Sequence, residues 1–154
     1  MSTAGAPASA AGFLRTAGGV VGEEWIDFNG HMGIAFYTEV FAVASRELWR
    51  VTGAAELEGG GPIVVASQLA TRYRRELFAG DAWEVCSAFA AVGERAATLS
   101  HRLLSGGKTC AVCHIQMVAL ERGSRLPTRF PDPVCVRAGA LRVPGLKDPF
   151  ADDA

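Results

Sequence analysis

Residues 34–52, IAFYTEVFAVASRELWRVT, decide the fold. Apolar residues recur in them at alternating spacings of three and four, in the series Ile34, Tyr37, Phe41, Ala44, Leu48 and Val51. That period indicates an amphipathic helix. Phe36, Val40 and Val43 widen the apolar face until it covers most of the circumference, which is typical of a buried helix. We expect a helix of about 28 Å from Ile34 to Thr52, ended by Gly53.

The sequence on either side of this helix favours β-strands. A short strand is expected over residues 15–21. Four longer strand-like runs follow the helix, and they cover residues 63–78, 82–92, 96–104 and 109–120. Short glycine-containing connections separate these runs, which predicts antiparallel hairpins. The expected fold class is therefore α+β, with one helix packed on one face of an antiparallel meander.

The length of 154 residues suits one domain. Hydrophobic residues make up 49%, with 18 Gly in addition, and this much apolar surface excludes an intrinsically disordered chain. We expect residues 1–14, rich in Ala, Gly and Ser, to form a disordered tail. The folded domain is expected over residues 15–122. The Pro- and Arg-rich residues 123–154 are expected to form an irregular C-terminal extension.

The charge balance excludes some classes of partner. Lys+Arg 15 against Asp+Glu 16 gives a net charge of -1, so we expect no overall attraction to nucleic acid or to an anionic membrane. A local basic patch remains possible. The first basic residue is Arg15, and Gly5 and Pro7 interrupt the segment before it, which argues against a secretory signal and leaves a transit peptide as the alternative. No run is apolar enough to span a membrane, and we expect a cytoplasmic protein.

Four cysteines are too few for a disulfide scaffold. The run Cys110-Ala-Val-Cys113-His114 matches the C-x-x-C-H pattern of haem attachment. The surrounding sequence is strand-like, however, and residues three apart in a strand face opposite sides of the sheet. The two thiols then cannot reach one haem or one metal ion. We interpret the match as accidental and expect no metal and no resident cofactor.

Residues 25–33, WIDFNGHMG, hold the polar side chains best suited to chemistry. Asp27 and His31 lie four positions apart in a glycine-containing loop directly before the helix. A helix N-terminus offers free N–H groups and partial positive charge, which suits an oxyanion. A carboxylate beside it can act as general base or nucleophile. Structural roles are the alternative: Asp27 or Asn29 caps the helix or braces the turn, and His31 is a core histidine.

This loop, with Ile34-Ala35-Phe36-Tyr37 after it, resembles the signature of hotdog-fold acyl-CoA thioesterases of the 4-hydroxybenzoyl-CoA thioesterase-like group. That signature has an Asp, then Gly-His three and four residues later, then a Tyr early in the helix. The resemblance covers about residues 16–120 and includes Arg74-Arg75-Glu76-Leu77 and Gly80-Asp81. The loop also resembles the thioesterase domain attached to some carnitine dehydrogenases, which is thought to act on betainyl-CoA. Gly33 departs from the pattern, because many relatives carry Asn there.

The resemblance implies an antiparallel sheet wrapped around one central helix, and hydrolysis of a small acyl-CoA to a free acid and CoA. Asp27 would activate water or attack the thioester carbonyl itself, and the backbone N–H of Ile34 would stabilise the oxyanion. His31 would orient the loop or the acyl group, and Asn29 would brace the turn. CoA is part of the substrate, so no cofactor is implied.

The resemblance also implies a homodimer or a dimer of dimers, because this family binds acyl-CoA where two protomers meet. The residues expected to bind substrate are Trp25, Phe28, Gly33, Tyr37, Arg74 and Arg95. The arginines would contact the CoA phosphates, and aromatic rings could hold a quaternary ammonium group. Two other functions stay open. One is a hotdog enoyl-CoA hydratase or dehydratase with His31 and Asp27 as an acid/base pair, and the other is a non-catalytic protein that binds acyl-CoA.

Overall fold

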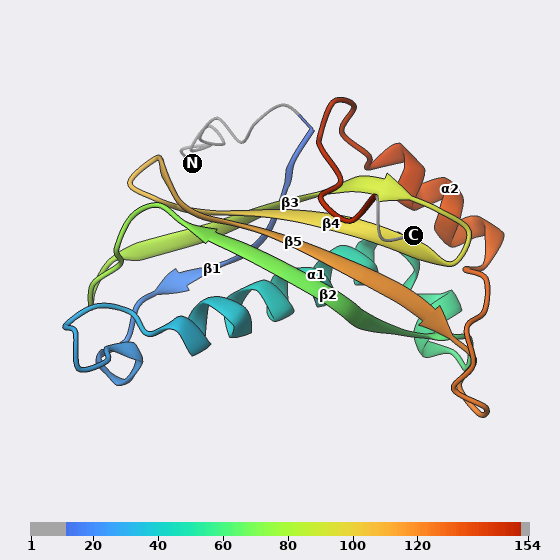
Figure 1. Cartoon of the computed structure of the whole chain (residues 1–154), viewed down its shortest axis with the longest axis horizontal. Coiled ribbons are helices and arrows are strands. Elements are labelled where there is room, and N and C mark those ends of the chain that lie inside the picture. Colours follow the sequence, from blue (N-terminus) through green and yellow to red (C-terminus); the bar gives the residue numbers. More distant parts are fainter. Residues whose placement is uncertain (1–11, 152–154) are drawn as a thin grey trace, which may run out of the picture.

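The computed structural model describes residues 12–151. A five-stranded antiparallel sheet lies against one long helix (Figure 1). The strands are β1 (Leu14–Val20), β2 (Ile63–Tyr73), β3 (Ala82–Val92), β4 (Ala96–Ser105) and β5 (Lys108–Leu120). The helices are the short η1 (Glu23–Trp25), the long α1 (Ile34–Glu58) and α2 (Asp132–Ala140). The α+β class expected from the sequence is confirmed.

The strand order is β1-β3-β4-β5-β2, so β1 and β2 form the two edges of the sheet. The predicted hairpins from β3 to β4 and from β4 to β5 are confirmed. The predicted hairpin between β2 and β3 is wrong, because β2 pairs with β5, where Tyr73 lies opposite Ala111. β2 ends at Tyr73 and not at residue 78. The following residues cross from this edge to β1, where the N–H of Gly80 donates to the C=O of Val21 at 2.8 Å.

Helix α1 is longer than predicted, because Gly53 interrupts the helix without ending it. Gly53 has φ -178° and ψ 48°, and helical residues continue from there to Glu58. A Cβ at Gly53 would lie 2.5 Å from Cγ2 of Val134 in α2. Glycine therefore lets the two helices approach more closely than any side chain would allow.

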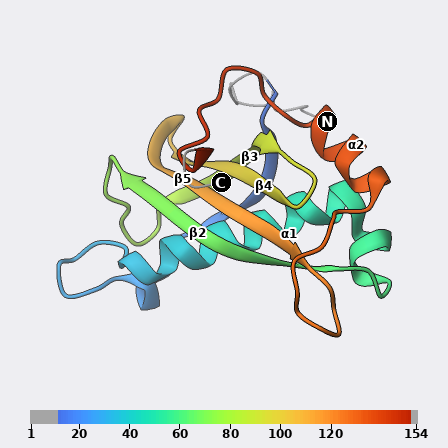
Figure 2. The same ribbon diagram turned by 45° about the vertical axis from the view of Figure 1, so that its right-hand side comes forward.

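The sheet covers one side of α1 (Figure 2). Phe41, Ala44 and Leu48 face the strands and are fully buried. Val43 and Val51 lie elsewhere on the helix and are exposed in the single chain. The prediction of a helix buried on every side is therefore wrong for one chain, because a five-stranded sheet covers only the face that it packs against.

The C-terminal extension holds a helix where irregular structure was predicted. Pro131 precedes α2 and Pro133 lies in its first turn, where the missing N–H of proline breaks no helical hydrogen bond. Val134 and Ala138 are buried in the same apolar cluster as Trp49 of α1. The prolines therefore mark the start of a helix and do not prevent one.

The face of the sheet opposite α1 is covered by both ends of the described chain (Figure 1). Residues 141–143 pair with Phe89 of β3, and Thr98 Oγ1 donates to Asp148 Oδ1 at 2.9 Å. Phe13 is buried against Cys86 on the same face. Residues 1–11 of the expected tail lie outside the described residues, but Phe13 and Leu14 are ordered parts of the fold.

The CAVCH run lies within β5, as the strand prediction required, and Cys110 and Cys113 are free, buried thiols. Among residues 12–151 no three His, Cys, Asp or Glu side chains lie together in a way that could hold a metal ion. No helix in this part of the chain is long and apolar enough to cross a membrane.

Candidate active site

The loop before α1 folds back on itself. The N–H of Asp27 donates to the C=O of His31 at 3.0 Å, and the N–H of Gly30 donates to the C=O of Asp27 at 3.0 Å. Ile26 and Met32 form an antiparallel bridge across its base. Gly30 has φ 84°, a left-handed conformation that favours glycine. The Asn-Gly pair thus makes the tight turn that brings Asp27 back beside the start of the helix.

The carboxylate of Asp27 braces this turn and faces the start of α1. Its Oδ1 accepts a hydrogen bond from the N–H of Asn29 at 2.8 Å. Its Oδ2 lies 3.7 Å from the position that a Cβ would take at Gly33, the residue before the helix. No side chain caps the N-terminus of α1. Of the two structural alternatives for Asp27, bracing of the turn is therefore observed and helix capping is not.

Ile34 begins α1, so its backbone N–H is one of the first four, which have no acceptor inside the helix. The aligned peptide dipoles add partial positive charge at this end. The side chain of Ile34 is 69% exposed and lines the same cavity as Asp27. The carboxylate and the helix N-terminus thus face one space, where a developing negative charge on an oxygen would be stabilised.

This space is a cavity of about 600 Å³, which we call the loop cavity. Its walls come from the loop, the first turn of α1 and the end of β2, and they comprise Asp27, Phe28, Asn29, His31, Met32, Ile34, Tyr37, Tyr73, Arg74, Arg75 and Glu76. The rings of Tyr37 and Tyr73 meet edge to face with centroids 5.0 Å apart. Burial raises the pKa of Tyr37, so its phenol stays protonated at neutral pH. Phe28, at the tip of the loop, is 97% exposed.

Seven of the ten site residues predicted from the sequence line the loop cavity: Asp27, Phe28, Asn29, His31, Ile34, Tyr37 and Arg74. Three do not. Trp25 stacks on Phe36 with centroids 5.3 Å apart, outside the cavity. Gly33 lies behind the carboxylate of Asp27. Arg95 lies in the β3–β4 turn, where its C=O bonds the N–H of Ala119, at the opposite end of the sheet.

His31 is half-buried at the cavity wall and is not a core histidine, so that alternative is wrong. Its Nδ1 lies 3.1 Å from the C=O of Met32, and its Nε2 lies 3.8 Å from Oε1 of Glu76. Both ring nitrogens thus have a polar neighbour, and the imidazole shares the cavity wall with Asp27.

Three further wall residues are Tyr73, the last residue of β2, and Arg75 and Glu76 of the motif that follows it, and of these the site prediction missed Tyr73 and Glu76. The N–H of Met32 donates to the C=O of Leu77 at 2.7 Å, which ties this segment to the loop. The predicted strand over residues 63–78 did not allow for that contact. The motif Arg74-Arg75-Glu76-Leu77 was the available signal, because two arginines and a glutamate in succession suit a loop better than a buried strand.

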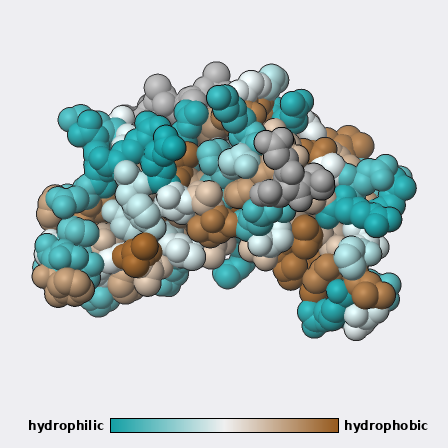
Figure 3. Space-filling model, viewed as in Figure 1, coloured by the Kyte–Doolittle hydropathy of each residue, from teal (hydrophilic) through white to brown (hydrophobic). Residues whose placement is uncertain are grey.

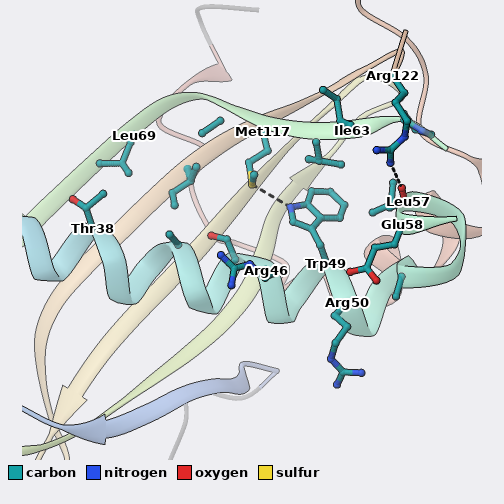
Figure 4. Close-up of a pocket in the computed structure, with 17 residues that line it drawn as sticks. Thr38, Arg46, Trp49, Arg50, Leu57, Glu58, Ile63, Leu69, Met117 and Arg122 are labelled. Carbon is teal, nitrogen blue, oxygen red and sulfur yellow. Dashed lines mark hydrogen bonds between the residues drawn. The ribbon is translucent and has the colours of Figure 1, made fainter. Parts of the chain in front are cut away.

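A second cavity of about 640 Å³ lies between α1 and β2, and we call it the α1–β2 groove (Figure 4). β2 stands away from the helix, and its Leu69 remains 45% exposed. The ring of Trp49 projects from α1 into the space beneath the strands, and its Nε1–H donates to Sδ of Met117 at 3.1 Å. Arg122 closes the far end by donating to the C=O of Leu57 at 2.8 Å. The groove is apolar along its length, with charged side chains at its rim.

The space-filling view, drawn from the side on which β2 runs, shows hydrophobic patches between hydrophilic residues (Figure 3). Leu69 and Tyr73 of β2 and Phe28 and Ile34 of the loop region are among the large apolar side chains exposed in the single chain. These residues lie along the groove and the loop cavity, so both sites share an exposed apolar border.

The architecture is similar to that of several solved structures. The chain resembles the structure of a predicted thioesterase from Bacillus stearothermophilus at 14% identity, with a TM-score of 0.77 over 85% of this chain and 97% of that one. A hypothetical Staphylococcus aureus protein in complex with CoA is 20% identical, with a TM-score of 0.74 over 89% and 90% of the two chains. A thioesterase from Thermus thermophilus, complexed with CoA and Zn, is 22% identical, with a TM-score of 0.73 over 85% and 96%. No curated protein matches the chain.

These likenesses confirm the hotdog fold expected from the sequence. The family described as the thioesterase-like superfamily matches residues 21–137, a span that includes the loop, α1, β2 and the Arg74–Leu77 segment. The chain therefore belongs to the thioesterase-like superfamily and is, as the sequence predicted, a thioester hydrolase of the hotdog fold.

Proposed function

We propose that this protein hydrolyses an acyl-CoA to a free acid and CoA, with Asp27 as the catalytic carboxylate. The proposal rests on the position of that carboxylate. One oxygen of Asp27 is engaged by the N–H of Asn29, and the other is directed to the start of α1. A thioester carbonyl in the loop cavity would meet this free oxygen and the N–H of Ile34 together.

In the first of two routes, Asp27 acts as a general base. The carboxylate takes a proton from water, and the water oxygen bonds to the carbonyl carbon. The carbonyl oxygen becomes an oxyanion stabilised by the N–H of Ile34. The C–S bond then breaks, and the CoA thiolate, whose thiol has a pKa of about 8.5, leaves and takes the proton from Asp27. His31 orients the loop or the acyl group, and Asn29 holds the turn.

As a nucleophile, Asp27 would bond to the carbonyl carbon directly and expel CoA, leaving a mixed anhydride that water then cleaves. A single turnover in ¹⁸O-labelled water tests the nucleophilic route. Label in the side chain of Asp27 would establish a mixed anhydride opened at the aspartyl carbon, because the general-base route and attack at the acyl carbon both place all label in the released acid.

Basic side chains beside the loop cavity suit the phosphates of CoA. Arg74, Arg75 and Lys108 lie around a surface depression next to the cavity, and Arg74 and Arg75 also line the cavity itself. Guanidinium groups bind phosphate through paired N–H donors. CoA would therefore lie across this end of the sheet, with its thioester directed to Asp27. Arg95 is too far along the sheet to contact the same CoA from the same chain.

The exposed border of the two cavities supports a homodimer. β2 is an edge strand with free backbone groups and exposed Leu69 and Tyr73, and a second copy would cover it. The α1–β2 groove would then be enclosed and would receive the acyl group. A dimer of dimers and a cytoplasmic location stay predictions, tested by sedimentation and by fractionation of cells.

The loop sequence makes betainyl-CoA one candidate among the small acyl-CoA substrates. The exposed ring of Tyr73 offers an aromatic face to a quaternary ammonium group, an attraction of about 0.5–2 kcal/mol. Release of free thiol from a panel of acyl-CoAs that includes betainyl-CoA, short alkanoyl-CoAs and an enoyl-CoA tests the proposal. Thiol release supports hydrolysis. Loss of the enoyl absorbance without thiol release would establish a hydratase, and tight binding without either reaction would establish a binding protein.

A further inference from the structure

The floor of the α1–β2 groove has two polar side chains. Four of its wall residues are buried, and these are Ser45, Trp49, Leu57 and Ile115. Ser45, only 4% exposed, and Trp49 follow each other by one turn on the same face of α1, so their side chains are neighbours. The other polar and charged wall residues, such as Arg46 and Arg50, are exposed at the rim.

Ser45 is held by a chain of hydrogen bonds that runs through the core. Its Oγ lies 2.8 Å from Nε2 of His101 on β4. Nδ1 of the same imidazole lies 2.6 Å from Oγ of Ser87 on β3, which lies 2.7 Å from Oγ1 of Thr16 on β1. At its two ends the chain reaches backbone carbonyls, Phe41 C=O at 2.9 Å from Ser45 and Val85 C=O at 3.3 Å from Thr16.

A neutral imidazole has one N–H donor and one acceptor nitrogen, so the chain has two arrangements. In the first, Nε2–H of His101 donates to Ser45, and the hydroxyl of Ser45 donates to Phe41 C=O. In the second, the hydroxyl of Ser45 donates to Nε2 of His101. Burial lowers the pKa of His101 to about 3, which removes the doubly protonated form at neutral pH. In either arrangement the proton of Ser45 is used inside the protein, and its oxygen keeps a free lone pair.

Trp49 offers a hydrogen-bond donor, whereas Ser45 offers an acceptor. Its Nε1–H donates to the thioether of Met117, which is a weak acceptor. An oxygen atom in the groove would be a better acceptor for that N–H. The floor of the groove thus presents an acceptor at Ser45 and a donor at Trp49, one helical turn apart.

We propose that the acyl group of the substrate carries a hydroxyl group, bound between Ser45 and Trp49. The proposal rests on the proposed function, because it takes the groove as the site of the acyl group. A hydroxyl both donates and accepts, so it satisfies the two floor groups at once. A ketone has no proton for Ser45, and an alkyl chain makes no hydrogen bond to either group, so both keep only their partners within the protein. A quaternary ammonium has no N–H, so this inference favours a hydroxyacyl group over a betainyl group.

The length of the groove indicates an aliphatic hydroxyacyl chain. Its wall on α1 begins at Thr38, and the straight part of the helix up to Thr52 alone measures about 21 Å at 1.5 Å per residue. An extended chain follows such a groove along its length, whereas a single aromatic ring would occupy only a small part of it. The substrate class is therefore a hydroxylated straight-chain acyl-CoA.

Binding of non-hydrolysable CoA thioether analogues tests the proposal without catalysis. The probes are the octanoyl analogue, the same analogue with a hydroxyl at each successive carbon, and the matching ketones, and calorimetry gives their dissociation constants. We expect at least one hydroxyl isomer to bind about 10-fold or more tightly than the octanoyl and ketone analogues. In Ser45→Ala that preference should fall to about 2-fold or less.

Ser87→Ala is the matched control, because it also removes a hydrogen bond to His101 but changes no atom of the groove wall. It should keep the hydroxyl preference of the wild type. Equal binding of all probes by the wild type, or an unchanged preference in Ser45→Ala, would overturn the proposal. A preference lost equally in Ser87→Ala would overturn it too. A protein that shows the preference but releases no thiol would refute the proposed function and leave this inference standing.

Discussion

Two histidines lie near α1, and they differ in burial and in the partners of their ring nitrogens. His31 lies at the N-terminal end of α1, half-buried, with both ring nitrogens near polar atoms of the loop and of the segment after β2. His101 lies under the middle of α1, fully buried, stacked on Phe41 at 5.9 Å and bonded to Ser45 and Ser87. The first imidazole is accessible to a substrate in the loop cavity, and the second joins three strands to the helix.

Burial, and not residue type, distinguishes the histidine of the candidate active site from the histidine of the core. Near His31 the polar groups stay partly hydrated, so they can exchange partners when a substrate enters. Around His101 the polar atoms depend on protein partners, because the ring is fully buried. The loop should therefore govern the rate of reaction, and the His101 chain should govern the free energy of unfolding.

The largest change in stability is expected for His101→Leu. The leucine fills similar space but leaves Ser45 and Ser87 without their imidazole partner. Each hydroxyl keeps its other partner, Phe41 C=O for Ser45 and Thr16 Oγ1 for Ser87, but loses one buried hydrogen bond, so we expect a loss of about 1–3 kcal/mol in the free energy of unfolding. Chemical denaturation measures it. A loss below about 0.5 kcal/mol would show that the chain does not stabilise the core.

The pH dependence of stability separates the same two histidines. The pKa of His101 falls from 6.5 to about 3 on folding, because burial penalises the charged ring and His114 lies nearby. The unfolded chain therefore binds the additional proton. The contribution of His101 is complete above pH 6.5 and is lost as the pH falls toward 3, by at most about 1.4 kcal/mol per pH unit.

Urea unfolding at a series of pH values between 7 and 4 measures this loss. His101→Leu is the control, because it removes the titrating group. Its stability should fall less steeply with decreasing pH than that of the wild type. Equal slopes in the two proteins would contradict the assignment of the slope to His101.

His31→Gln should change the rate and leave the fold intact. Glutamine keeps one polar contact with the loop but loses the fixed orientation of the ring, and we expect kcat/KM to fall by about 10-fold. The midpoint of thermal unfolding should stay close to that of the wild type. A stability loss as large as that of His101→Leu would break the distinction between the two histidines.

Gly53→Ala tests the packing at the other end of α1. Its new methyl group would meet Val134 of α2, so we expect a loss of about 1–3 kcal/mol. Gly139→Ala is the matched control, because a Cβ at Gly139 meets no atom within 4 Å. Equal melting temperatures for the two variants would show that the close approach of α1 and α2 is not required.

The parts of this molecule that were predictable from the sequence are the local ones. The spacing of Ile34, Tyr37 and Phe41 specifies a helix whatever the rest of the chain does, and Asn29-Gly30 specifies the turn that returns Asp27 to the helix start. The hairpins β3–β4 and β4–β5 are local in the same sense, because short turns join each pair of strands.

The features that escaped prediction depend on distant contacts. Beyond the end of β2 the chain bonds the loop through Leu77 and Met32, which are 45 residues apart in sequence. The close approach of α1 to α2 at Gly53 involves Val134, and the polar chain through His101 depends on four separate elements. No local pattern contains that information, because serine and histidine side chains in a strand are as compatible with a solvent-facing position as with a buried one.

Measurement of kcat for thiol release by Asp27→Asn tests the central claim most directly. Asp148→Asn is the matched control, because Asp148 also accepts the backbone N–H two residues on, that of Phe150 at 3.0 Å, but lines neither the loop cavity nor the depression beside it. We predict that Asp27→Asn lowers kcat by at least about 10²-fold with an unchanged unfolding midpoint, whereas Asp148→Asn keeps kcat within about 3-fold. Equal kcat values for the wild type and Asp27→Asn would contradict the role of Asp27 and with it the assignment of the loop cavity as the active site.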